Sequence, residues 1–363
     1  MDGNTVKIGL LWLVSSFYFI KAISRFLDIK FSNAWISVFV TYVAIVFHYL
    51  YIGTSITSST NEILICGAAL LALVACAGSA LDLASFLKPA VTLFGAVATV
   101  FLLINLLLAL TGNQDAFIDG NFVGITANSN MLAGYLALCC FPLFLQSAIT
   151  LDSRRLRRIA SVLLVVCCYL ILLSRSRAAL LSICASSTFV LMTTKRLRRG
   201  GKLLILFTIA TATLVAFMQA SEKYGEVELL STRSILLFQR LTAISEHPWL
   251  GWGFNSSVYN YYDESNIFPA MEKGNTILQV FEEFGIPFGS VVIIGLFYLI
   301  WQAAKTLRQW RYGLAFSATL IGSAVHLMFE TWLFNFPALL SIYFWIILLV
   351  AGQKQFLTAP STS

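Results

Sequence analysis

The feature that most constrains this chain is a series of continuous apolar runs, most of them about 17–22 residues long. Folded as helices, runs of that length cross about 30 Å of hydrocarbon. Strands of a membrane barrel would alternate apolar and polar residues, and these runs do not. Because a bilayer core offers the backbone no hydrogen-bond partners, a helix satisfies each N–H and C=O within its own segment. The sequence therefore predicts an all-α, polytopic membrane protein.

Composition agrees with this prediction. Charged residues make up only 11% of the 363 residues and hydrophobic residues 58%, whereas a soluble domain carries about 25% charge. The pattern predicts about eleven transmembrane helices in a single transmembrane domain, 1–363, with one large polar loop at 220–284. The apolar runs lie at about 8–20, 33–52, 62–81, 90–111, 130–150, 159–174, 178–194, 203–219, 285–304, 313–332 and 335–351. The first residues, MDGNTVK, lack the basic region of a cleavable signal peptide, so the first run is expected to remain as a helix.

Basic residues in alternate loops predict the topology. Short loops rich in Lys and Arg stay in the cytoplasm, and with eleven spans the basic loops all fall on one face. The N-terminus is then external, the C-terminus is cytoplasmic, and the 220–284 loop is external. The basic loop residues are Lys21, Arg25, Lys30, Arg154, Arg155, Arg157, Arg158, Lys195, Arg196, Arg198, Arg199, Lys202, Lys305, Arg308 and Arg311.

Charge and cysteine usage exclude several functions. The net charge of +7 follows from the topology, and the chain has no clustered basic domain that would bind nucleic acid. All seven cysteines lie within apolar runs and none has the spacing of a metal site. The three histidines are scattered along the chain, so we expect no metal centre.

The clearest chemical signal is Arg175 and Arg177, in LLSRSRAALLS. Both are predicted at the external end of two helices, against the positive-inside bias. An arginine at a membrane edge either extends its side chain to the lipid headgroups or belongs to a functional site. A guanidinium presents a planar fork of donors that matches phosphate oxygens. The functional interpretation is therefore a phosphate clamp.

The external loop adds a second group of basic and aromatic residues. Arg233 and Arg240 are seven residues apart, on one helical face, and are expected to bind phosphate or to pair with a glutamate: Glu226, Glu228 or Glu246. Glu282 and Glu283 are expected on the surface of the loop, although Glu282 could neutralise an arginine. Trp249 and Trp252 follow in a glycine-containing turn, HPWLGWG. Aromatic residues here are expected either to form a belt at the membrane interface or to stack against sugar rings.

In order along the chain, four segments resemble the superfamily of O-antigen ligases and O-antigen polymerases. TANSNMLAGYL (126–136) resembles its Asn-x-Asn-x-x-Ala segment, and SRAALLS (176–182) its Ser-Arg-Gly-Ala-type helix start. STR (231–233) with EHPWLGWG (246–253) resembles the large periplasmic loop. GNTILQVFEEFGIPFG (274–289) resembles the closing His-Asn segment of that loop. Gly274 stands where ligases of the family carry histidine, and Phe288 shifts the second glycine to Gly289.

The resemblance implies a membrane glycosyltransferase of lipopolysaccharide or polysaccharide biosynthesis in the bacterial inner membrane, with its active face in the periplasm. Its donor would be an undecaprenyl-diphosphate-linked oligosaccharide bound beside membrane lipid, with no metal and no cofactor, and its partner could be a chain-length regulator protein. Gly274 argues for a polymerase over a ligase. The resemblance also implies that Asn128, Asn130 and Asn275 bind substrate.

The expected mechanism is inverting transfer of a lipid-linked glycan to a sugar hydroxyl. Arg177 and Arg233, helped by Arg175 and Arg240, would hold the diphosphate as it leaves. Glu272 is the predicted general base, and the alternative is that it is an exposed carboxylate of the loop. His247 is the second candidate for the base, and the alternative is that it supports the Pro248 turn.

Two other functions remain open at this stage. A ligase would transfer the finished glycan to a lipid or protein acceptor. A transporter or lipid flippase would need charges at the helix centres, and these centres are nearly free of charge.

Overall fold

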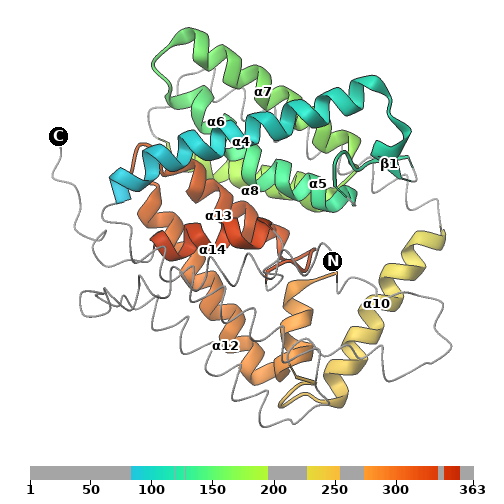
Figure 1. Ribbon diagram of the computed structural model, residues 1–363. Helices are drawn as coiled ribbons and strands as arrows, with labels where there is room; N and C mark the ends of the chain where they lie inside the picture. The colour runs from blue at the N-terminus through green and yellow to red at the C-terminus, as the bar shows by residue number, and fades with distance from the viewer. Residues whose placement is uncertain are drawn as a thin grey trace, which may run out of the picture. The chain divides into compact units, whose positions relative to one another are not determined.

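The computed structural model describes residues 83–118, 120–126, 128–194, 227–253, 274–333 and 339–351. These parts of the chain are mostly helical, with one short antiparallel hairpin of β1 (Phe117–Ile118) and β2 (Asn121–Phe122) (Figure 1). The helices are α4 (Leu83–Thr111), α5 (Ser129–Tyr135), α6 (Phe141–Thr150), α7 (Arg154–Leu173), α8 (Arg177–Thr193), α10 (Val227–Glu246), α12 (Thr276–Leu307), α13 (Leu314–His326) and α14 (Leu339–Ala351), joined in places by the 3-10 turn η2 (Gln114–Ala116) and the π-helical turn η3 (Leu136–Cys140).

Four apolar segments are long enough to cross a membrane by length and composition: Leu87–Thr111, Ser129–Thr150, Arg154–Leu173 and Thr276–Leu307. The helices α8, α13 and α14 are shorter and also apolar. All seven fall on predicted apolar runs, so the helical fold of these runs is confirmed, and their length and composition suit a multi-pass membrane protein. The runs 8–20, 33–52, 62–81 and 203–219 lie outside the described residues, and the total of eleven spans stays a prediction.

The chain divides into two compact units, and the single transmembrane domain predicted above stays a prediction. The bundle unit contains the described residues of 84–234 and 300–330. The loop unit contains the described residues of 1–83, 235–299 and 331–363. The boundaries fall within α4, α10 and α12 and between α13 and α14.

In the bundle unit, Ser129–Thr150 is one apolar segment whose helix changes pitch in the middle. The π-helical turn η3 comes directly before Pro142, which lacks an N–H to bond the carbonyl of Leu138. The hydroxyl of Thr319 in α13 donates to that carbonyl over 2.8 Å. The thiol of Cys167 donates to the carbonyl of Leu136 over 3.4 Å. The hydroxyl of Thr319 thus satisfies a backbone carbonyl that the proline leaves without its usual partner.

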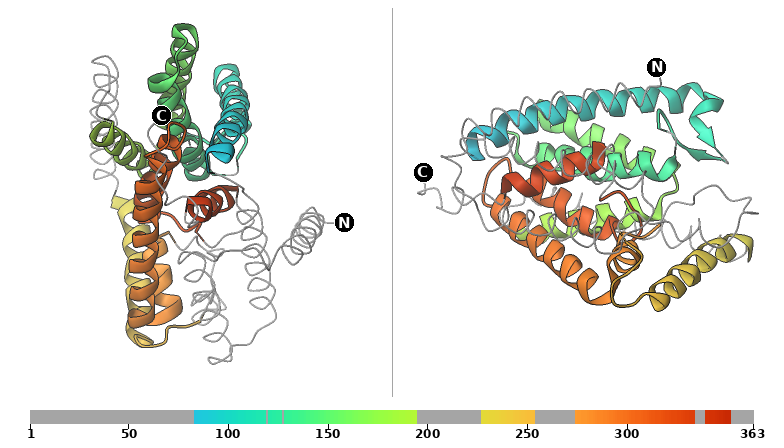
Figure 2. Two further views of the ribbon diagram at one scale, coloured as in Figure 1. Left: turned by 90° about the vertical axis from the view of Figure 1, so that its left-hand side faces the viewer. Right: turned by 60° about the horizontal axis from the view of Figure 1, so that its bottom comes forward.

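Small residues allow α8 and α13 to pack closely. The hydroxyl of Ser186 donates to the carbonyl of Ala318 over 2.8 Å, and a Cβ added to Gly322 would overlap Ser186. The helix α4 runs along one side of α5 and η3 (Figure 2), where Phe101 lies edge-on to Tyr135. Close approach of this kind is how membrane helices gain contact energy without a hydrophobic driving force between them.

One contact fixes which turns of the bundle unit lie at the same end. The guanidinium of Arg311 donates to Asp152 over 2.6 Å. The α6–α7 turn and the α12–α13 turn are therefore neighbours. The 20 residues of α7 form a helix about 30 Å long, which runs from the α6–α7 turn to the turn that contains Arg175. Two loops predicted to share the cytoplasmic face thus share one end, and the α7–α8 turn lies at the other.

In the loop unit, α12 consists of two helices joined at Gly285, whose φ of 74° and ψ of 169° are not helical. Residues 276–284 precede the bend, and the apolar run predicted at 285–304 follows it. The helix α14 is held by Leu333, whose carbonyl accepts from Ser341 over 2.7 Å and from the indole of Trp345 over 2.9 Å.

Candidate functional site

The turn between α7 and α8 presents two arginines around a buried serine. Arg175 is exposed, and its φ of 54° makes it the one non-glycine residue with a positive φ among the described residues. A residue held in this sparsely populated region carries strain, and such residues concentrate at functional sites. Arg177 is the first residue of α8 and is half-buried. The prediction that these arginines lie at the end of two helices is confirmed; their role in binding stays a prediction.

Ser176 occupies the N-cap position of α8 but does not cap the helix. Its side chain is 2% exposed, and its hydroxyl has no hydrogen-bond partner among the described residues. The first N–H groups of a helix have no acceptor within the helix, and the helix dipole adds positive potential there. The start of α8 therefore combines amide donors, a hydroxyl and two guanidinium groups, which is a chemistry suited to phosphate.

The segment before α5 lies at the same end of the bundle unit, because α5 and α8 both begin where α4 and α7 end (Figure 1). Asn128 caps α5, with its side-chain oxygen accepting from the N–H of Asn130 over 2.7 Å. The buried Asn105 of α4 accepts from the N–H of Ile125 over 3.1 Å. The predicted Asn128 and Asn130 thus hold the start of α5 in place, and their role in substrate binding stays a prediction.

In the loop unit, the turn after α10 pairs with the bend in α12 through three backbone hydrogen bonds. The N–H groups of Trp252 and Gly253 donate to the carbonyls of Glu282 and Glu283 over 2.8 and 3.0 Å. The N–H of Ile286 donates to the carbonyl of Pro248 over 2.7 Å. These bonds fix the HPWLGWG turn against the point where α12 changes direction.

Two glycines make this pairing possible. Gly251 has a φ of 68°, and a Cβ added there would overlap the carbonyl of Glu283 and the nitrogen of Gly285. Gly285 has a φ of 74°, and a Cβ there would overlap the carbonyl of Trp249. A side chain at either position would separate the two backbones.

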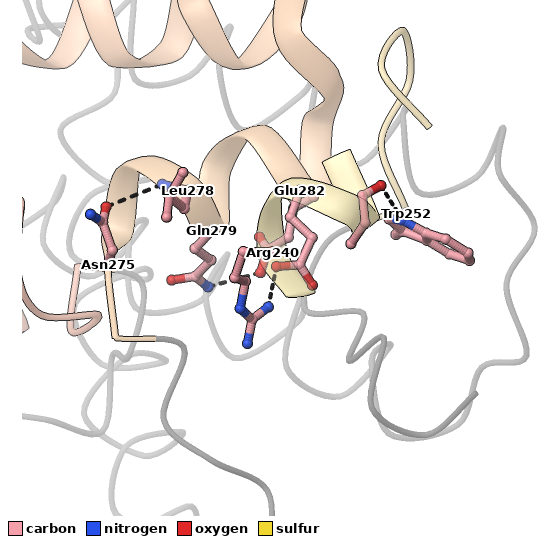
Figure 3. A network of polar contacts seen from close by, with 8 residues as sticks. Arg240, Trp252, Asn275, Leu278, Gln279 and Glu282 are labelled. Carbon is pink, nitrogen blue, oxygen red and sulfur yellow. Dashed lines mark hydrogen bonds and ion pairs between the residues drawn. The ribbon is translucent and has the colours of Figure 1, made fainter. Parts of the chain in front are cut away.

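Arg240 projects from α10 into the same junction (Figure 3). Its side chain is 4% exposed and forms an ion pair with Glu282, which is fully buried. The amide of Gln279 donates to the buried Glu283 over 2.8 Å. The buried ion-pair partner of Arg240 is Glu282, 42 residues away along the chain, which agrees with the expectation that Glu282 could neutralise an arginine. Its predicted help in holding diphosphate stays a prediction.

The aromatic residues of the turn divide into one that is anchored and one that is exposed. The indole of Trp252 donates to the carbonyl of Ala243 over 2.9 Å, and its ring lies edge-on to His247 with centroids 4.1 Å apart. Trp249, in contrast, is 75% exposed. His247 is therefore positioned by Trp252, as expected for a residue that supports the Pro248 turn; the predicted roles of all three stay predictions.

The remaining predicted site residues lie at the start of α12, within α10 and outside the described residues. Asn275 caps α12, with its oxygen accepting from the N–H groups of Ile277 and Leu278 over 2.8 and 3.2 Å. Gly274 before it has a φ of 61°. Arg233 lies within α10, where the backbone alone is described, and Glu272 lies outside the described residues.

Sequence reasoning missed Ser176 as a site residue, and it assigned the carboxylates at the bend mainly to the loop surface. The signal for Ser176 was its place directly before a helix start, between two arginines. The signal at the bend was a pair of adjacent glutamates, Glu282 and Glu283, just before an apolar run. Their burial depends on the packing of α10, which the spacing of residues does not reveal. Among the described residues, no cluster of His, Cys, Asp and Glu could hold a metal ion.

Comparison with family models finds that residues 159–293 match the O-antigen ligase family. This range begins in α7 and ends after the bend of α12, so it includes Arg177, Arg233 and the whole 220–284 loop. The resemblance to the O-antigen ligase and polymerase superfamily is confirmed over this range. Asn128 and Asn130 lie before it. A comparison with curated proteins finds no match.

Proposed function

We propose that this chain, whose residues 159–293 match the O-antigen ligase family, polymerises undecaprenyl-diphosphate-linked oligosaccharide repeats. The family supports a membrane enzyme of the ligase and polymerase type that transfers glycans. The finer proposal places it in the bacterial inner membrane, with its active face in the periplasm. The observation that carries the proposal is the start of α8, where Ser176 is buried without capping the helix and lies between Arg175 and Arg177.

In the proposed step, a hydroxyl oxygen of the acceptor sugar attacks the anomeric carbon of the donor. The bond from that carbon to the diphosphate oxygen breaks, and the lipid diphosphate leaves with the electron pair. Arg177 and Arg233 hold the diphosphate, and the hydroxyl of Ser176 donates to one of its oxygens. The hydroxyl proton of the acceptor passes to Glu272. Positioned donors of this kind contribute about 3–4 kcal/mol each where they meet developing charge.

The backbone at Gly274 favours a polymerase over a ligase. Ligases of the family carry histidine at the corresponding place, and Gly274 has a φ of 61°, a conformation that side-chain-bearing residues rarely adopt. The chain is therefore built around a glycine here, beside the Asn275 cap. A ligase remains the second candidate, because the matching family is described as O-antigen ligase.

The test reconstitutes the purified protein in vesicles with undecaprenyl-diphosphate-linked repeats and follows the length of the lipid-linked product. Arg177→Ala is expected to lower the transfer rate by about 10²–10³-fold, because a donor to the leaving group is lost. Ser176→Ala is expected to lower kcat/KM by about tenfold or more, since a hydrogen bond to a charged group contributes about 1.5–3 kcal/mol.

Two controls match these variants. Arg154→Ala removes an exposed arginine at the opposite end of α7. Ser187→Ala removes another buried hydroxyl of α8 that has no hydrogen-bond partner among the described residues. Both are expected to retain wild-type transfer. Wild-type product ladders from both Arg177→Ala and Ser176→Ala would refute the clamp. In cells, loss of a polymerase leaves one repeat on the acceptor, whereas loss of a ligase leaves none.

A further inference from the structure

The surface of α10 in the loop unit has three sectors. Successive residues of a helix are about 100° apart, so the residues of 237–246 cover the whole circumference. One sector is buried against the protein and contains Arg240. A second is exposed and polar. A third is exposed and apolar, with Phe238 at 72% exposure. The buried sector is Arg240, Ala243 and Ile244; the polar sector is Gln239, Thr242 and Glu246; and the apolar sector, named here the α10 apolar face, is Leu237, Phe238 and Leu241. The exposed Ser245 falls between Leu241 and Phe238 on the helix surface, and its hydroxyl donates to the carbonyl of Thr242 over 2.7 Å.

A helix on the surface of a soluble domain needs two sectors, one towards the core and one towards water. The third sector of α10 is both exposed and apolar, so it matches neither description. Helices that lie in a membrane interface combine a polar face with an exposed apolar face of this kind. The buried ion pair between Arg240 and Glu282 fixes the rotation of α10 about its own axis. With Arg240 facing the protein, the apolar sector is left exposed.

The turn after α10 carries two further exposed apolar side chains. Trp249 and Leu250 are 75% and 50% exposed. The hydrogen bond from Ile286 to Pro248 ties this turn to the first residue after the bend in α12. Trp249 and Leu250 are thus held at the level where the apolar part of α12 begins. Tryptophan is enriched at that level of membrane proteins, where its ring meets both acyl chains and headgroups.

The apolar part of α12 belongs to a candidate membrane span, Thr276–Leu307. Val291, Ile294 and Tyr298 are exposed at spacings of three and four residues, which makes one stripe along the helix. Ile286 and Phe288 are exposed at its outer end. An exposed apolar stripe on a membrane span faces lipid, and the turn carrying Trp249 is bonded to its end.

We infer that the α10 apolar face, together with Trp249 and Leu250, inserts into the bilayer interface on the side where α12 leaves the loop. The partner is the boundary between lipid headgroups and acyl chains. The 220–284 loop is then not wholly in water: α10 lies along the membrane with Gln239, Thr242 and Glu246 towards the aqueous side. This inference does not depend on which glycan the protein transfers.

The test measures depth at single positions of the full chain in phospholipid vesicles. Cysteine is introduced at Phe238 or Trp249, and at the matched polar-sector positions Gln239 and Thr242, and is labelled with bimane. The unsubstituted chain, labelled in the same way, gives the background from its seven native cysteines. Quenching is compared between lipids with a nitroxide at carbon 5 of the acyl chain and iodide in the water.

Labels at 238 and 249 are expected to be quenched about threefold more by the nitroxide lipid than labels at 239 and 242, because an interfacial helix buries its apolar face by about 5–10 Å. Iodide is expected to give the reverse order. Equal iodide quenching at 238 and 239 would place the face in water and overturn the inference. Protection of 238 from both quenchers would also overturn it, since protein and not lipid would then cover the face.

The measurement contains no glycan donor. A chain that fails to polymerise lipid-linked repeats but shows the expected quenching therefore refutes the proposed function alone. A chain that polymerises repeats while its label at 238 is in water refutes the membrane contact alone.

Discussion

At the scale of single residues, the ion pair of Arg240 and Glu282 holds α10 on α12. Both side chains are buried, so neither charge has water as an alternative partner. Removing one member of such a pair leaves an uncompensated buried charge and costs about 3–5 kcal/mol. Replacing both with apolar residues of similar volume is often neutral, because the desolvation cost disappears as well.

We therefore expect Arg240→Met and Glu282→Leu to lower the midpoint of thermal unfolding strongly as single changes, and the double variant to recover most of the loss. The measurement is a double-mutant cycle on the purified protein in detergent. Arg311→Ala, which breaks the exposed pair with Asp152, is the control and should leave the midpoint nearly unchanged.

The same cycle also decides the role of Arg240 in catalysis. If the double variant folds and transfers glycan at the wild-type rate, Arg240 acts through Glu282 and does not hold the diphosphate. A stable double variant without transfer activity would instead support the role predicted from the sequence.

Single residues also show what the sequence could reveal about the site. Arg175 and Arg177 were predictable because an arginine at the end of an apolar run is conspicuous. Glu282 was expected to be able to neutralise an arginine, but its pairing with Arg240 was not predictable, since the two are 42 residues apart and the contact depends on how α10 packs against α12. The place of Ser176 between two arginines was visible in the sequence, but its burial without a capping bond was not, because a serine before a helix normally caps it.

At the scale of elements, the junction between the HPWLGWG turn and the bend of α12 is a contact between two backbones. Gly251 and Gly285 both adopt a positive φ, and each lacks space for a Cβ. The sequence shows both glycines, and the family resemblance places them in the loop and its closing segment. That the two lie against each other follows from the structure alone.

Gly251→Ala is expected to destabilise this junction, by about 1–2 kcal/mol for the left-handed conformation and by more for the overlap with Glu283. Gly295→Ala, in the same unit, is the control, because a Cβ there meets nothing within 4 Å and alanine favours the helix. Limited proteolysis of the reconstituted protein provides the measurement. Faster cleavage after α10 is expected for Gly251→Ala alone; equal cleavage rates would contradict the account of the turn.

Two local features of the helices and strands were not predictable from the apolar runs. The run at 130–150 was predicted as one helix, and the structure divides it at the π-helical turn before Pro142. The proline itself was visible in the sequence. The donor that compensates for it, Thr319, belongs to α13, so the local pitch depends on a residue far along the chain. The short hairpin of β1 and β2 was not expected, because two-residue strands leave no periodic pattern.

At the scale of the whole molecule, sidedness is the property on which the proposed function depends. The bonded pair of Arg311 and Asp152 requires the turns after 150 and after 307 to share one compartment. We expect reporter fusions after 153 and 311 to fluoresce as cytoplasmic green fluorescent protein, and fusions after 175 and 250 to show periplasmic alkaline phosphatase activity. Phosphatase activity at 153, or its absence at 250, would reverse the topology and remove the lipid-diphosphate donor from reach.

The helical, multi-pass character of the described chain was predictable, because the length of an apolar run and its lack of charge follow from the bilayer itself. The division into two compact units was not, since hydropathy says where a helix lies and nothing about which helices pack together.

The bond between Pro248 and Ile286 has a mechanical consequence. A long apolar helix tilts to match the thickness of the bilayer around it. The HPWLGWG turn is hydrogen-bonded to α12 just after its bend. Any tilt of the apolar part of α12 therefore also moves Trp252, His247 and the end of α10. The geometry of the loop is therefore coupled to lipid chain length, and the protein should work best in membranes of one hydrophobic thickness.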